Sequence, residues 1–436
     1  MAPGSETTEA TGLRTHPLTG IVQGALWAVA ASAGLVGSFA SGEGVRGVLI
    51  GIAGGLILGM GFGILSWRFT RYVIDGAELR INSGVLTKSS RRIPYERIQS
   101  VDIVETLLAR ILGLAELRIE MAGGKDSRTT LKFLKLDDAR ALRTVLMNRA
   151  HGHHGDGPEI EEPRDLIALV EPERIMIGTL LSLDFMFSAI GVVALIVGGV
   201  WFGQIVVALG GLIPLGWWLL QIIAKRVLLQ WGFTLTRGTR GLRIERGFLS
   251  RNSQTIPFDR VQGIAVEEPY VWRRLGWQRL EVDVAGQSSH RDDQGSVSSS
   301  TLLPIADPEL ADHVIAELIP SAQPWTVPLI HAPQRSWIFA PIGWRYRAAG
   351  ADDHTYVSTT GWLQRTTSII PHHKTQSVAL RQGPLQRLRR VATVEVHSPK
   401  GPVDAEGRHL DEGDARRQAF AQLEHARNAR SARSVL

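Results

Sequence analysis

The sequence contains no cysteine and is poor in charged and aromatic residues. Without cysteine the chain can form no disulfide and no thiolate metal site, and it has no cysteine nucleophile. Charged residues make up 21% of the 436 positions and aromatic residues 7%, whereas 44% are hydrophobic and 46 are glycine. So little charge with so much glycine is typical of a chain with membrane segments. The scarcity of aromatic rings argues against nucleic acid as a partner, because single strands are bound by stacking bases on such rings.

The net charge of +6 is concentrated in one part of the chain. From residue 321 onward there are 16 Lys and Arg against 9 Asp and Glu, so the rest of the chain is almost neutral. Two interpretations remain open for this basic C-terminal part. It can meet an anionic partner such as lipid, or it can be a solvated basic surface.

Four stretches are long and apolar enough to span a bilayer, residues 20–40, 47–66, 175–201 and 204–224. Short turns join them in pairs, which predicts two transmembrane helical hairpins over residues 20–66 and 174–224. Arginine and lysine flank the open ends of both hairpins, so the positive-inside rule places the large domains in the cytoplasm. A cleaved signal peptide is the alternative for the first stretch, because Ser38-Phe39-Ala40 fits a cleavage site.

Two features within these stretches concern packing and function. Glycine recurs at every fourth position of the second stretch, which gives one smooth helix face where another helix can approach closely. The five glycines are Gly47, Gly51, Gly55, Gly59 and Gly63. Asp184 is the one charged residue in the third stretch. An acid in a membrane span is a candidate functional residue, but Asp184 lies near the cytoplasmic end, where a carboxylate can reach water.

An internal repeat occurs three times with the same spacing. Each copy has a glycine, an Ile-Pro pair whose proline follows ten residues later, and a glutamine five residues after that. The anchors are Gly84, Pro94 and Gln99 in the first copy, Gly247, Pro257 and Gln262 in the second, and Gly361, Pro371 and Gln376 in the third. Alternating apolar residues predict strands after each glutamine, and the glycine predicts a turn with positive φ. A helix is expected at the end of each copy, over residues 136–149, 307–319 and 412–433.

The hairpins and the Gly…Ile-Pro…Gln repeat together resemble the bacterial pleckstrin-homology-like (PH-like) membrane proteins, the YdbT-like family with tandem bacterial PH domains. The resemblance covers the chain from about residue 20 to its end. It implies a multidomain α+β membrane protein with three small seven-stranded β-barrels, each capped by a C-terminal helix. The third copy departs from the pattern, because Arg389-Arg390 stand where the others have Leu112-Gly113 and Leu275-Gly276.

The predicted organisation therefore has eight parts. They are an N-terminal tail (1–19), hairpin 1 (20–66), PH-like domain 1 (67–150), a linker (151–173), hairpin 2 (174–224), PH-like domain 2 (225–320), a degenerate hairpin remnant (321–344) and PH-like domain 3 (345–436). Residues 286–300, rich in Ser and Asp, are expected to be a disordered loop between strands.

The sequence predicts no catalytic residue, no cofactor and no metal site. His151, His153 and His154 cluster in the linker, but nothing near them completes a four-ligand zinc site. His372 and His373 are expected on the surface. The candidate contacts to anionic lipid or to a partner are basic residues of copies one and three. They are Lys88, Arg91, Arg92, Arg381, Arg387, Arg389 and Arg390.

The function expected from these features is that of a non-enzymatic scaffold in a bacterial plasma membrane. Three copies of one domain serve avidity or assembly better than they serve one reaction. The expected partners are the membrane, anionic lipid headgroups, a second copy of the chain, or a second PH-like membrane protein. A transport or lipid-handling protein is the alternative, and an enzyme acting on lipid ranks last.

Overall fold

The computed structural model describes residues 13–14, 53–54, 57, 71–74, 78–83, 89–121, 128–150, 165–239, 241–248, 250–285, 300–398 and 403–433. The chain forms two compact units. Unit 1 draws on Met1–Glu162 and Leu249–Gln254, and unit 2 on Pro163–Phe248 and Thr255–Leu436. Several predictions lie outside the described residues: nearly all of hairpin 1 with its glycine strip, the histidines at 151, 153 and 154, and the loop at 286–299.

The first copy, in unit 1, consists of a four-stranded sheet, a three-stranded sheet and a C-terminal helix. Its elements are β1 (Leu13–Arg14), β2 (Arg71–Ile74), β3 (Glu78–Ser83), β4 (Ser89–Pro94), β5 (Ile98–Thr106), α3 (Leu107–Ile111), β6 (Leu114–Met121), β7 (Arg128–Lys135) and α4 (Leu136–Ala150). Helix α4 packs its buried face, which includes Leu142 and Leu146, against this copy's core. The alternation at Leu117–Met121 predicted β6 correctly, because its apolar side chains all face that core.

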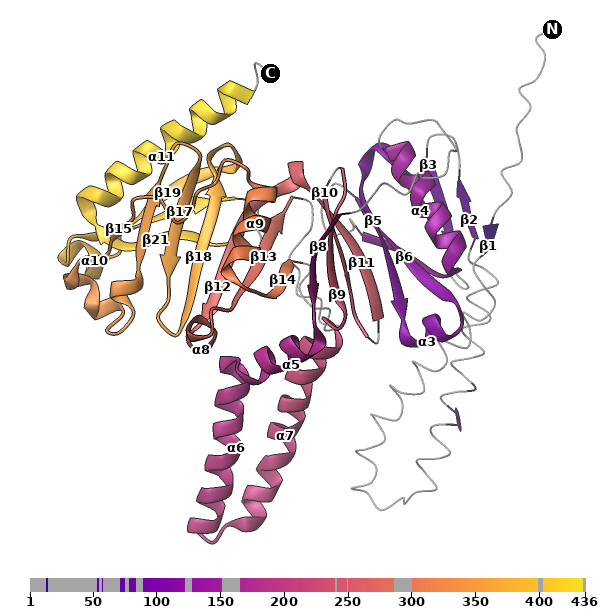
Figure 1. Ribbon diagram of the computed structural model, residues 1–436, viewed down its shortest axis with the longest axis horizontal. Helices are drawn as coiled ribbons and strands as arrows, with labels where there is room; N and C mark the ends of the chain where they lie inside the picture. The colour runs from indigo at the N-terminus through magenta and orange to yellow at the C-terminus, as the bar shows by residue number, and fades with distance from the viewer. Residues whose placement is uncertain are drawn as a thin grey trace. The chain divides into compact units, whose positions relative to one another are not determined.

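The second copy repeats this order and contains the second predicted hairpin. Its elements are β8 (Asp165–Val170), α5 (Pro172–Leu180), α6 (Leu183–Trp201), α7 (Ile205–Ile223), a π-helix (Ala224–Leu228), β9 (Phe233–Arg237), β10 (Gly241–Arg246), β11 (Ser250–Pro257), β12 (Val261–Pro269), α8 (Tyr270–Arg274), β13 (Gln278–Val284), β14 (Thr301–Ala306) and α9 (Pro308–Leu318). Strand β8 precedes the hairpin and pairs with β9, which follows it. The hairpin is therefore an insertion between two neighbouring strands of one sheet (Figure 1).

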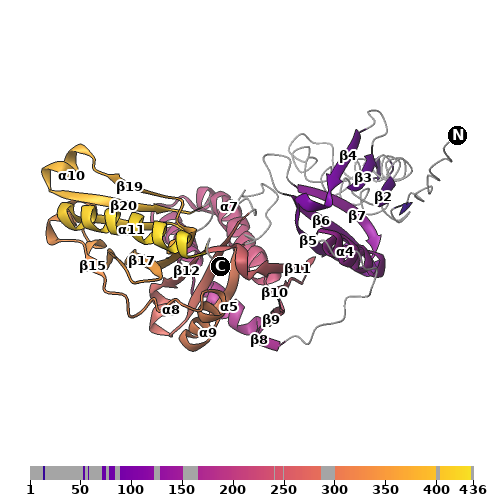
Figure 2. The same cartoon turned by 90° about the horizontal axis from the view of Figure 1, so that it is seen from above.

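The third copy carries short 3-10 helices where the second carries its hairpin. Its elements are β15 (Ile330–His331), η5 (Gln334–Phe339), η6 (Trp344–Tyr346), β16 (Ala348–Ala351), β17 (Thr355–Thr360), β18 (Gln364–Pro371), η7 (His372–Lys374), β19 (Ser377–Arg381), α10 (Pro384–Leu388), β20 (Val391–His397), β21 (Ala405–Asp411) and α11 (Glu412–Arg433). Helix α11 lies across the three-stranded sheet of this copy (Figures 1 and 2). The described residues of each copy thus form seven strands, the number that the resemblance implied.

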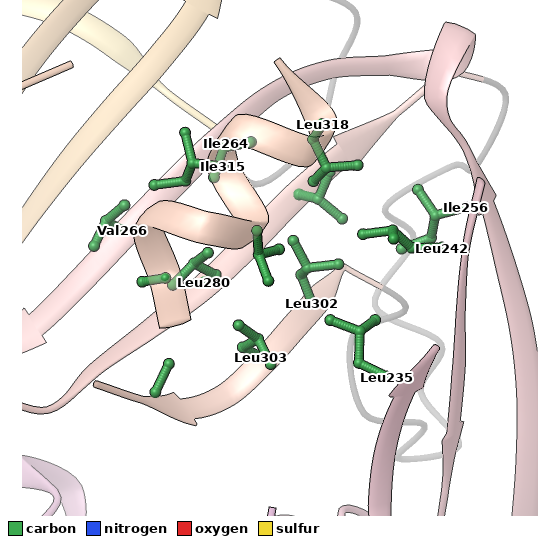
Figure 3. Packing of buried hydrophobic residues seen from close by; sticks show 14 of the residues in the cluster. Leu235, Leu242, Ile256, Ile264, Val266, Leu280, Leu302, Leu303, Ile315 and Leu318 are labelled. Atoms are coloured by element: carbon green, nitrogen blue, oxygen red, sulfur yellow. The ribbon is translucent and has the colours of Figure 1, made fainter. Parts of the chain in front are cut away.

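The described strands do not close into separate barrels. In unit 2 the edge of the second copy's three-stranded sheet, β12, pairs antiparallel with β18 of the third copy. Ile264 lies opposite Ile369, and both are fully buried. One apolar cluster runs through this junction, built largely from the second copy (Figure 3) and reaching Val357 and Ile369 of the third. The expected barrel is therefore wrong in this respect: the edge that would close one domain is taken up by the next domain.

The third predicted span is broken near its start. A single helix was expected over 175–201, but α5 ends at Leu180 and α6 begins at Leu183. Helix α5 is held against the second copy, since Trp272 Nε1 donates a hydrogen bond to the Gly178 carbonyl at 3.1 Å and Arg174 pairs with Asp307. The packing is close at Gly178, because a Cβ there would lie 2.2 Å from Ile305 Cδ1 and that side chain would have to move. Among the described residues, α6 is the one helix long and apolar enough to cross a membrane.

Candidate functional site

The sequence-predicted basic residues of the third copy gather around one surface lobe. We define the lobe as η5, the following residues up to the end of η6, and α10 with Arg389 and Arg390. Its parts are joined by Arg335, which pairs with Asp411 and donates a hydrogen bond to the Arg390 carbonyl at 3.1 Å. Phe339 stacks on His409, with ring centroids 4.5 Å apart. The lobe is therefore a fixed feature of the third domain.

The lobe presents apolar side chains to solvent. Leu385 and Leu388 of α10 are 65% and 78% exposed. Trp337, Ile338 and Ile342 are also largely exposed. Scattered exposed apolar residues are ordinary, but a concentration of exposed apolar side chains on one lobe is typical of protein or membrane interaction sites. Sequence reasoning singled out the arginines here and interpreted residues 321–344 as a hairpin remnant, but it missed the exposed Leu385 and Leu388 of α10.

Arg390 is held in an unusual backbone conformation. Its φ is +50°, in the left-handed region that side chains with a Cβ rarely adopt. The corresponding residues of the other copies are Gly113 and Gly276, with φ of +67° and +68°. The third copy therefore keeps an arginine where the backbone favours glycine. Strain of this kind costs on the order of 1–3 kcal/mol and is concentrated at functional sites.

The other predicted basic contacts have different surroundings. Arg387 is exposed on α10. Arg389 is half-buried and is the first residue after that helix. Arg381 ends β19, and its Nε lies 2.9 Å from Glu395 Oε2, so part of its charge is neutralised. In the first copy Arg92 is exposed, whereas Lys88 and the side chain of Arg91 lie outside the described residues. Arg387, Arg389 and Arg390 lie together on and after α10, whereas Arg381 lies at the end of β19.

Asp184 has a partner at the base of the hairpin. Its Oδ2 accepts a hydrogen bond from Arg226 Nη2 at 2.5 Å. Burial lowers the pKa of Arg226, and the neighbouring Arg279 lowers it further, while Asp184 and Glu267 act in the opposite direction. The carboxylate therefore stabilises a partly buried guanidinium, which is a structural role.

The expectation that His372 lies on the surface is wrong. Its side chain is 1% exposed, and its Nε2 donates to the Asp352 carbonyl at 2.8 Å. His425 of α11 packs edge-on against it, with its Nδ1 3.1 Å from His372 Nε2. The contact joins η7 to the C-terminal helix. Across the described segments, no group of three His, Asp or Glu side chains could hold a metal ion.

Two histidines should make the third domain sensitive to acid. Burial lowers the pKa of His372, and His425 and His354 lower it further while Asp352 acts against them. Burial, with Arg347 and Arg408 nearby, lowers the pKa of His409 to about 4, against an opposing effect of Glu406. Both pKa values lie below that of an unfolded histidine, about 6.5. The contribution of the two neutral histidines to the stability of the third domain is therefore complete above pH ~6.5. It is lost as the pH falls toward the pKa values that the two histidines have in the folded domain.

We expect hydrogen exchange in peptides from residues 345–433 of the intact chain to accelerate between pH ~6.5 and pH ~4, after correction for intrinsic rates. The variants His372→Gln and His409→Asn should each flatten this dependence. Asparagine is chosen for position 409 because it tolerates the positive φ found there. His331→Gln, at an exposed histidine, is the control and should change nothing. Equal acid sensitivity in all variants would assign the effect to other groups.

Comparison with known proteins agrees with the three copies seen in the fold. The family model described as "Bacterial PH domain" matches residues 25–150, 189–322 and 313–424. A protein of Bacillus subtilis (strain 168), the UPF0699 transmembrane protein YdbT, is 22% identical over 288 residues. The alignment covers 59% of this chain and 57% of that protein, so the chain spans little more than half of the relative's length. The three matches together cover most of the sequence, and the chain belongs to the bacterial PH domain family.

Proposed function

We propose that the chain is a non-enzymatic membrane scaffold that holds three PH-like domains at the cytoplasmic face of a bacterial plasma membrane. The apolar helix α6 and the transmembrane relative support the membrane location. The pairing of β12 with β18 supports a role in assembly, since these domains already bind one another through strand edges. The sequence alternative of a transport protein depended on Asp184 lining a path, and that carboxylate is bonded to Arg226.

We further assign the lobe of the third domain to anionic lipid at the inner leaflet. The observation that carries this assignment is Arg390, an arginine retained at a glycine-type backbone position beside exposed Leu385 and Leu388. Apolar side chains that enter the headgroup region and arginines that meet lipid phosphates are the two parts of an interfacial anchor. The third copy lacks a hairpin of its own among its described residues, and such an anchor would hold it at the surface.

The absence of native cysteine allows a direct test in the intact chain. An environment-sensitive fluorophore on Ile342→Cys should shift to shorter wavelength in nanodiscs containing phosphatidylglycerol, and high salt should reverse the shift. Each charge near an anionic leaflet contributes about 1 kcal/mol, so Arg389→Ala with Arg390→Gly should shift docking by about 30-fold. Membrane insertion should be unchanged.

The choice of Arg390→Gly protects this test from misfolding. It restores the residue that the other copies use at this φ, so the fold is relieved of strain while the charge is lost. Arg416→Ala with Arg427→Ala, on α11 outside the lobe, is the charge-matched control. Identical emission in neutral and anionic nanodiscs would rule out lipid as the lobe's ligand and leave a protein partner.

A further inference from the structure

The two junctions between consecutive copies use the same edges in the same register. In unit 2, Glu268 of β12 lies opposite Arg365 of β18. In unit 1, Glu105 of β5 lies opposite Arg251 of β11. Glu105 and Glu268 stand at equal distances after their repeat glycines, and so do Arg251 and Arg365. Each junction therefore joins the first strand of one copy's three-stranded sheet to the last strand of the next copy's four-stranded sheet, with a carboxylate opposite an arginine.

The third copy has the corresponding edge with no partner strand among the described residues. Strand β19 ends the sheet β19-β20-β21, and it corresponds to β5 and β12. Leu380 is 41% exposed, whereas its equivalents Val266 and Ile103 are buried in their junctions. An open strand edge with an apolar side chain is a template for adding another strand.

The charges on β19 determine which strand fits. Arg381 and Gln382 occupy the positions of Glu267 and Glu268 in the second copy, so the carboxylate of the internal junctions is missing. The side chain of Arg381 is 70% exposed, and its carboxylate partner among the described residues is Glu395 on its own sheet. A strand that completes this junction must therefore supply the negative charge itself.

A second copy of this chain would not supply it. Strand β4, which ends the four-stranded sheet formed by the described residues of the first copy, has the sequence Ser-Ser-Arg-Arg-Ile-Pro. In the shared register Ser89 would lie opposite Arg381, with Arg91 diagonal to it. Like charges across strands are destabilising, and basic residues on edge strands prevent self-association.

We infer that β19 is the docking edge for a PH-like domain of a different chain. The last strand of that domain's four-stranded sheet would carry a carboxylate opposite Arg381. The partner would extend the internal array by one more junction in the same register. This inference rests on the proposed scaffold function and names the kind of partner that the scaffold recruits.

The probe is a second copy of the full chain with altered charges on β4. Strand β4 is suitable because it holds the same place in its four-stranded sheet as β11 and β18 do in theirs. Chain one carries Leu380→Cys. Chain two carries Ser90→Cys with Ser89→Glu and Arg91→Glu, so that its β4 has the predicted acidic character. Position 90 is chosen because Val266 pairs with Thr367 and Ile103 with Ser253 at the equivalent positions. The two chains are mixed in one membrane under mild oxidation, where they should form a disulfide-linked heterodimer. The control replaces chain two by a chain that carries Ser90→Cys alone, with Ser89 and Arg91 unchanged. Cross-linking of chain one to chain two should be at least 10-fold faster than cross-linking of chain one to this control.

Three other outcomes would overturn the inference. Equal cross-linking with native β4 would make a second copy the occupant. No cross-linking with either probe would show that β19 does not dock strands. Equal cross-linking from Ser377→Cys, which lies three residues or about 10 Å away along the strand, would indicate random collision. The fluorophore at position 342 reports lipid docking separately, so failure of the lipid assignment would be distinguishable from failure of this one.

Discussion

Trp272→Ala is expected to lower the free energy of unfolding of unit 2 by about 3–5 kcal/mol, the range for truncating a buried tryptophan. The Trp272 side chain is 2% exposed. It contacts α5 and donates a hydrogen bond to the Gly178 carbonyl of that helix. The guanidinium of Arg279 lies 5.5 Å from its ring centroid and would lose that cation–π contact. Truncation therefore removes core volume, a hydrogen bond and a charge contact together.

The measurement for Trp272 is urea denaturation of the full chain in detergent, combined with hydrogen exchange in the peptide covering residues 172–180. We expect the midpoint to fall and α5 to lose protection before the sheets do. Trp325→Ala is the matched control, because Trp325 is 48% exposed and bonds only to Asp312 on the surface. Equal losses in both variants would contradict the assignment of Trp272 as the link between hairpin and domain.

Gly361→Ala should destabilise the third domain by about 3 kcal/mol, since it combines strain with a collision. The φ of Gly361 is +89°, and a Cβ there would lie 1.9 Å from the Gln364 carbonyl oxygen in the same turn. The turn joins β17 to β18, so its distortion would also loosen the ladder between β18 and β12. Denaturation with hydrogen exchange on β12 and β18 would detect both effects.

Two further glycine variants separate the causes of the Gly361 effect. Gly276→Ala has a positive φ of +68° but open space around the new Cβ, so it measures strain alone. Gly343→Ala, with negative φ and only Ala340 Cβ at 3.8 Å, should be nearly neutral. If Gly361→Ala were no worse than Gly276→Ala, the carbonyl contact would carry no energetic weight.

The repeat made two strands of each copy and all three C-terminal helices predictable. The glycine anchors have the positive φ that a turn requires at Gly247 and Gly361, and the helix expected at 412–433 begins and ends there. Alternation at Val101 and Ile103, and at Ile264 and Val266, marks strands because one face of each is buried. The same alternation at Val378 and Leu380 marks β19, although Leu380 is 41% exposed. These turns, strands and helices are determined by residues close together in the sequence, so the sequence alone is enough to predict them.

Other features depended on information that alternation does not carry. Most other strands were not located from the sequence. Among them, β1, β8 and β15 lie before the apolar stretches, in segments interpreted as tail, linker and remnant. The burial of His372 could have been found, since it aligns with Tyr95 and Phe258, and Tyr95 is 4% exposed. Which sheet edges pair between copies is a long-range property, and the pair of Glu268 and Arg365 across β12 and β18 leaves no local pattern in the sequence.

The hairpin is inserted between β8 and β9, and this position makes the inserted segment independent of the strand pairing on either side of it. Both ends of the insertion are fixed by one ladder, with Val170 opposite Phe233, and in the third copy the same ladder position holds His331 opposite Ala348. The segment between the two strands is about four times longer in the second copy, yet closing such a loop costs only about 1 kcal/mol more. The segment between the first two strands of a copy can therefore change in length and character without changing the ladder that fixes its two ends. The strand edges that pair with a neighbouring copy, such as β12 with β18, lie elsewhere in the sheet and do not depend on that segment.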